Sequence, residues 1–144
     1  MDRVEKVMEL FGQGCNCSQA MLAGFGAAYG LEQGLAQDLG RALGGGLGRS
    51  ALTCGAITGA VLVLGLACQG QAGNELALRQ RSYGAVRELM RRFKELHGSL
   101  ECRELLGVDI SSDEGLRQAK EAGLFGTRCA DLVRDTARLL GALL

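Results

Sequence analysis

Proline is absent from this chain of 144 residues. Globular proteins usually contain about 5% proline, and proline interrupts helices because it lacks a backbone N–H and its ring clashes with the preceding turn. No helix of this chain is therefore broken by proline. The 23 glycines must provide most of the breaks between helices.

Aromatic residues and net charge are also scarce. Aromatics make up 4% of the chain, tryptophan is absent, and 16 basic residues balance 16 acidic ones. Proteins that bind single-stranded nucleic acid stack bases on aromatic side chains, and nucleic acids or anionic membranes attract a surplus of positive charge. The composition therefore argues against a nucleic-acid partner. The most apolar segment, residues 53–67, carries no charge but is shorter than the roughly 20 residues that cross a bilayer, so we expect no membrane span.

The N-terminal segment does not look like a secretory signal. Residues 1–10 mix charged and apolar side chains, whereas a signal contains an uninterrupted apolar stretch. Six cysteines without such a signal indicate a cytoplasmic location, where thiols stay reduced unless they bind metal or take part in redox cycles. A hydrophobic content of 47% supports a core without disulfides.

Helical periodicity dominates the chain, and no segment alternates in the manner of a β-strand. We predict an all-α, single-domain bundle over residues 1–144, with about six to eight helices and short glycine-rich connections. The expected helices cover residues 4–11, 17–29, 32–43, 53–67, 74–97, 99–106, 111–122 and the segment from 127 onward.

Several polar residues are predicted to cap these helices, because their side chains can accept hydrogen bonds from first-turn N–H groups. The expected caps are Asn16, Ser99, Thr127 and a capping box of Ser111 with Glu114. The helix over 74–97 is expected to turn one stripe inward, made of Tyr83, Val86, Met90, Phe93 and Leu96 or His97.

Four of the six cysteines lie where a helix is expected to begin. They are Cys17, Cys54, Cys102 and Cys129. A helix N-terminus carries a partial positive charge, which favours the thiolate, the form that acts as nucleophile and metal ligand. Four such thiols on four helices predict one shared site at one end of the bundle. Cys15 precedes its cap and Cys68 lies at the negative end of its helix, so both are expected to be accessory or inert.

Glycines surround these cysteines. Residues 44–50 fit neither a P-loop nor a dinucleotide fingerprint, because no strand precedes them and an arginine stands where the P-loop lysine would be. The loop is expected to be a tight connection, or a concave array of N–H groups that holds an anion near Cys54. Gly55 and Gly59 form a small-residue ridge that should bring another helix close to Cys54.

The motifs resemble those of a known family. They occupy residues 14–20, 44–48, 53–60, 101–107 and 128–129. Together they are similar to the C_GCAxxG_C_C family of redox-active proteins from bacteria and archaea, over nearly the whole chain. The resemblance assigns the family's cysteine positions to Cys17, Cys54, Cys102 and Cys129. In this chain the central motif reads Cys-Gly-Ala-x-x-Gly, so its first two residues are permuted relative to the family's name.

Three functions remain open. The first is thiol–disulfide or electron-transfer chemistry by Cys17, Cys54, Cys102 and Cys129, with a redox partner protein or a small thiol or disulfide, which would make the protein a thiol–disulfide oxidoreductase. The second is a four-cysteine metal site in which the same residues bind zinc or an iron–sulfur cluster. The third is a helical interaction domain with inert thiols. The sequence also leaves a homodimer open.

Overall fold

The computed structural model describes residues 1–144, with eight α-helices and no β-strand, which confirms the predicted all-α class. The helices are α1 (Arg3–Gly12), α2 (Cys17–Gly26), α3 (Gln33–Gly40), α4 (Gly55–Leu66), α5 (Glu75–His97), α6 (Cys102–Leu106), α7 (Asp113–Glu121) and α8 (Arg128–Leu143). Short 3₁₀ helices follow α2 and α3, at Ala27–Tyr29 and Arg41–Leu43. No helix combines the length and the apolar composition needed to cross a membrane.

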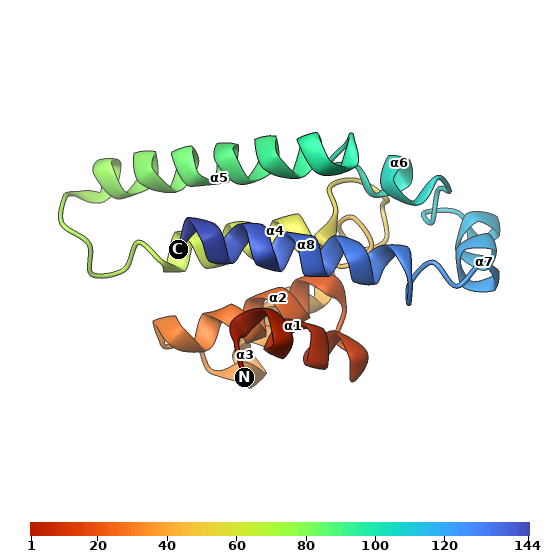
Figure 1. Ribbon diagram of the computed structural model, residues 1–144, viewed down its shortest axis with the longest axis horizontal. Coiled ribbons are helices and arrows are strands. Elements are labelled where there is room, and N and C mark those ends of the chain that lie inside the picture. Colours follow the sequence, from red (N-terminus) through yellow and green to blue (C-terminus); the bar gives the residue numbers. More distant parts are fainter.

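The helices form three layers. In Figure 1, α5 lies along one side, α4 and α8 run through the middle, and α1, α2 and α3 lie on the other side. Helix α4 packs against α2, α5 and α8. The short helices α6 and α7 lie at one end of the bundle, where α8 also begins.

Two groups of buried side chains form the interior. The larger contains 21 residues and joins α1, α2, α4, α5 and α8, with Phe25, Ile57 and Phe93 among its fully enclosed side chains. The smaller contains five residues, among them Cys102, Leu106 and Ile110, and lies beneath α6 and α7. Helix α6 therefore borders both groups, since Leu105 belongs to the larger one and Leu106 to the smaller one.

Glycines and asparagines end and begin the long helices as expected. Asn16 caps α2 in a capping box with Gln19, and Asn74 caps α5 by accepting from the N–H of Ala77. Gly98 ends α5 with a φ of 84°, a left-handed conformation that glycine adopts without a steric cost.

Two of the predicted caps are wrong, and a third occupies its predicted position without the capping bond. Ser112, not Ser111, caps α7 by accepting from the N–H of Gly115. Glu101, not Ser99, occupies the cap position of α6, without a side-chain bond to the helix. Thr127 precedes α8, but its hydroxyl donates to Gly123 O at 2.8 Å instead of accepting from α8. The start of α6 is held instead by the backbone bridge between Glu101 and Thr53.

The buried stripe of α5 differs in part from the prediction. Phe93 is fully buried as expected, together with Leu89. His97 takes the last inward position in place of Leu96, since the His97 side chain is 8% exposed and Leu96 is 60% exposed. Tyr83, however, is 56% exposed. No residue before Leu89 on this helix is buried. Only the C-terminal half of α5 packs firmly on α4 and α8, because its N-terminal half extends beyond the packed part of the core.

Candidate functional site

Cysteines from four helix starts line one cavity of about 640 Å³. Cys17 is the first residue of α2, Cys54 the cap of α4, Cys102 the first residue of α6, and Cys129 the second residue of α8. Cys15 lines the same cavity. The starts of α6 and α8 lie at the same end of the bundle as the loop that precedes α4 (Figure 1).

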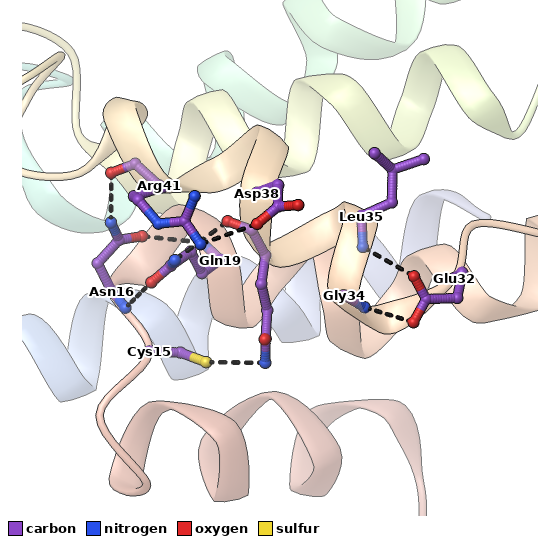
Figure 2. Close-up of polar contacts among 9 residues, drawn as sticks. Cys15, Asn16, Gln19, Glu32, Gly34, Leu35, Asp38 and Arg41 are labelled. Carbon is purple, nitrogen blue, oxygen red and sulfur yellow. Dashed lines mark hydrogen bonds and ion pairs between the residues drawn. The ribbon is translucent and has the colours of Figure 1, made fainter.

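The start of α2 is fixed by a hydrogen-bond chain shown in Figure 2. Asn16 accepts from the N–H of Gln19 at 2.9 Å, and its own N–H donates to Gln19 Oε1 at 2.9 Å. Asn16 Nδ2 also donates to Arg41 O at 3.0 Å. Gln37 Nε2 lies 3.5 Å from Cys15 Sγ and donates to it. These bonds tie Cys15 and Cys17, on either side of Asn16, to the end of α3.

Helices α2 and α4 meet at the predicted glycine ridge. A Cβ atom on Gly55 would overlap Cys17 Sγ, and one on Gly59 would lie 3.0 Å from Ser18 Cα. The Ser18 hydroxyl donates to Gly55 O at 2.7 Å across the same contact. The absence of these two side chains allows the backbone of α4 to approach Cys17 closely.

A pair of backbone segments joins the starts of α4 and α6. Thr53 and Glu101 form an isolated antiparallel bridge, in which Cys54 N donates to Leu100 O at 2.9 Å. Cys102 N donates to Leu52 O in the same bridge. Both cysteines are therefore held by their own backbone groups, although they are 48 positions apart in the chain.

The loop before α4 has an unusual backbone. Five consecutive residues, 45–49, have φ between 59° and 72°, and Leu47 and Arg49 are among them. Non-glycine residues adopt this conformation at a cost of about 1–2 kcal/mol each. The side chain of Arg103 holds the end of the loop, donating from Nε to Ala51 O at 3.1 Å. The loop thus keeps a strained conformation against the cavity wall.

Cys129 is placed by contacts of its neighbour in the chain. Arg128 Nε donates to Leu105 O at 3.1 Å, which joins α8 to α6. Arg128 Nη1 lies 3.3 Å from His97 Nδ1, and His97 Nε2 lies 3.1 Å from Asp135 Oδ2. Burial raises the pKa of Cys129, and the positive charge of Arg128 beside it offsets part of that rise.

Burial outweighs the effect of the helix termini on the acidity of these thiols. It raises the pKa of Cys102 to about 11 and that of Cys129 to about 12. The pKa values of Cys17 and Cys54 are also raised, again chiefly by burial. The sequence-based expectation of easily ionised thiols is therefore wrong for the unliganded protein, because a thiolate loses hydration in this cavity.

Cys17 is the thiol best supplied with hydrogen-bond donors. Its pKa is raised by burial, although the residue keeps some exposed surface, and is lowered by the N–H groups of Gly45, Ser18 and Cys17 and by the Ser18 hydroxyl. Its negative charge in turn raises the pKa of Cys54, Cys102 and Cys129. The charge of Cys17 therefore acts on all three of the other thiols. The loop donor that was expected near Cys54 is directed at Cys17.

A family model matches residues 15–143 of the chain, with the description "Putative redox-active protein (C_GCAxxG_C_C)". The chain belongs to this family. Neither a curated protein nor a solved structure matches it. The family supports a redox role, and the resemblance stated from the motifs is confirmed.

The family's glycine motif coincides with the contact between α2 and α4. In this chain the motif begins at Cys54, and its two glycines, Gly55 and Gly59, are the positions where an added Cβ would meet α2. The spacing of these glycines therefore has a direct geometric role, which is to let Cys17 and Cys54 share one cavity wall.

Sequence reasoning missed two contributors to the site. Cys15 lines the cavity, although it was expected to be accessory, and Ser18 supplies donors to Cys17. The signal for Cys15 was present, because an extended cap residue turns its two neighbours towards one side, as along a strand, and Asn16 has a ψ of 173°. Cys68 lies outside the cavity, 3.1 Å from Ser82 Oγ.

The arrangement of the cysteines bears on the four-cysteine metal site. Thiolates are suitable ligands for zinc and for iron–sulfur clusters. However, no three His, Cys, Asp or Glu side chains lie close enough together to hold one ion. The cysteines in this arrangement do not fit a single metal ion.

Proposed function

We propose that the protein is a thiol–disulfide redox protein in which Cys17 is the nucleophile and one of Cys54, Cys102 and Cys129 resolves the mixed disulfide. The observation that carries this proposal is that thiols from four helix starts line one cavity. Membership of a redox-active family supports it independently.

The reaction begins with loss of the Cys17 proton to solvent. The thiolate attacks one sulfur of a disulfide substrate, the substrate S–S bond breaks, and a mixed disulfide forms while the first substrate thiolate leaves and takes a proton. A second cavity thiol then loses its proton and attacks Cys17 Sγ, which releases the second substrate thiol. Two electrons pass from the protein to the substrate, and the protein keeps one internal disulfide. A dithiol partner restores the reduced protein by the reverse exchange.

The donors around Cys17 support its assignment as nucleophile. The N–H groups of Gly45 and Ser18 stabilise negative charge on its sulfur, whereas Cys54, Cys102 and Cys129 ionise with more difficulty once Cys17 is charged. The same repulsion disappears when Cys17 becomes part of a mixed disulfide. Formation of the mixed disulfide therefore makes a neighbouring thiol easier to ionise, at the step where a resolving thiolate is needed.

The test is peptide mapping of reduced, metal-free protein after mild oxidation. We expect one or two internal disulfides among the four cysteines, with Cys17 in one of them and unchanged helix content by circular dichroism. Cys17→Ser should abolish the mixed disulfide with a small thiol, and Cys68→Ser, the matched control, should have no effect. Oxidation that yields neither an internal nor a mixed disulfide would refute the proposal. Stoichiometric zinc, or iron with visible absorbance, in protein purified without oxygen would instead support the four-cysteine metal site.

A further inference from the structure

The cavity is larger than an exchange between protein thiols requires. Two cysteines form a disulfide with their Cβ atoms only about 3.5–4.5 Å apart, whereas this cavity has a volume of about 640 Å³. Sites for small organic ligands occupy about 300–1,000 Å³. The volume is therefore that of a site for a small molecule that reaches the thiols.

The lining contains no charged side chain. Its apolar side chains come from α1, from α6 and the segment after it, and from α8 with the segment before it. They are Met8, Phe11, Leu105, Leu106, Ile110, Phe125, Ala130, Leu132 and Val133. Asn16 supplies the only polar side chain besides the five cysteines, and its amide is already bonded to Gln19 and Arg41.

This composition selects against charged substrates. A carboxylate or ammonium group that enters an apolar cavity loses hydration, and no charged side chain in the lining replaces it. Glutathione and similar peptides carry several such groups. An uncharged disulfide with an apolar body loses little on entry and gains by burying its surface.

We propose that the cavity binds a small, uncharged disulfide with an apolar body, or the dithiol formed from it, next to Cys17. The redox step rests on the proposed function: the ligand's S–S bond accepts two electrons and two protons, and two protein thiols become a disulfide. The selection by charge rests on the cavity lining and does not depend on that chemistry.

Charge selection can be measured with two alkylating reagents that differ in one group. Iodoacetamide is neutral and iodoacetate is an anion, and both transfer a small group irreversibly to a thiolate. We expect the ratio of their rates, neutral over anionic, to be about tenfold higher at Cys17 than at Cys68 in the same protein, because the anion must enter an apolar site. Equal ratios at Cys17 and Cys68 would overturn the proposal.

A pair of variants at Ala130 tests whether the cavity itself sets this ratio. Ala130 is the third residue of α8 and lines the cavity, and acidic residues in a first helical turn stabilise the helix. Ala130→Asp should raise the ratio at Cys17, and Ala130→Lys should lower it towards that of Cys68. Circular dichroism controls for folding. A ratio that stays the same in both folded variants would contradict selection by the lining.

Disulfide probes separate this proposal from the proposed function. Dithiodipyridine is uncharged and dithiobis(nitrobenzoate) is a dianion, and both release a coloured thiol. We expect the folded protein to favour the uncharged probe by about tenfold more than the urea-unfolded protein does, since unfolding removes the cavity. Reaction with neither probe while the alkylation ratios hold would refute the redox function alone. Reaction with both probes at the unfolded ratio would refute the selectivity alone.

Discussion

Replacing Gly55 by alanine tests the contact that brings α4 against Cys17. The new Cβ would overlap Cys17 Sγ and would lie 2.8 Å from Ser18 Oγ and 3.3 Å from Leu43 O. Ser18 Oγ is held by its hydrogen bond to the carbonyl of Gly55 itself, and Leu43 O is a backbone atom, so only Cys17 Sγ can give way by rotating its side chain. We therefore expect Gly55→Ala to push α2 away from α4.

The expected size follows from two opposing terms. Overpacking a core contact costs about 1–3 kcal/mol, and a weakened buried hydrogen bond adds about 1 kcal/mol. Alanine recovers up to about 1 kcal/mol of helix propensity. The net loss of folding free energy is about 1–3 kcal/mol, which lowers the urea midpoint by about 1 M.

The assay is urea unfolding of the reduced protein, followed by circular dichroism, with the alkylation rate of Cys17 measured in parallel. The matched control is Gly84→Ala, since Gly84 lies within α5 and an added Cβ there meets nothing within 4 Å. The control should gain up to about 1 kcal/mol from helix propensity alone. If Gly55→Ala is as stable as Gly84→Ala and Cys17 reacts at an unchanged rate, the close contact between α2 and α4 is wrong.

Two further predictions concern the acidity of the thiols. Because burial raises the pKa of Cys102 to about 11 and that of Cys129 to about 12, the folded state holds protons that the unfolded chain releases above about pH 9. The urea midpoint of the reduced protein should therefore fall steadily between about pH 9 and 11, and a flat profile would contradict the burial of these thiols. Arg128→Met removes the positive charge that lowers the pKa of Cys129, so alkylation of Cys129 at about pH 8 should slow by about three- to tenfold. Arg128→Lys keeps the charge and should restore part of the rate. An unchanged rate in Arg128→Met would show that Arg128 does not affect the acidity of Cys129.

The sequence predicts the helices well because their signals are local. Apolar spacing determines the face of α8 that carries Leu132, Val133 and Leu140, all of them buried. Asn16 and Gly98 act as expected because each works through bonds within a few residues of itself. The four cysteines were identified because each lies at or next to a helix start, which local patterns also indicate.

The errors arise where tertiary structure decides. Neighbouring serines at 111 and 112 are equivalent by pattern, and the loop geometry selects Ser112 as the cap. Tyr83 was expected inside, but at this point of α5 the neighbouring Ser82 contacts Cys68, and Tyr83 is 56% exposed. The direction of the thiol pKa shifts was wrong because the positive end of a helix can be inferred from sequence, whereas the depth of a cavity depends on how distant segments pack.

The uneven burial along α5 has a consequence for local unfolding. Its buried residues, Leu89 and Phe93, both lie in the C-terminal half, and His97 at its end contacts Arg128 beside the cavity. Segments with few buried contacts open more often than the core does. Amide hydrogens near Glu75 should therefore exchange with solvent much faster than those near Phe93, within one continuous helix. The outer turns can open and close while the turns beside the cysteines remain closed.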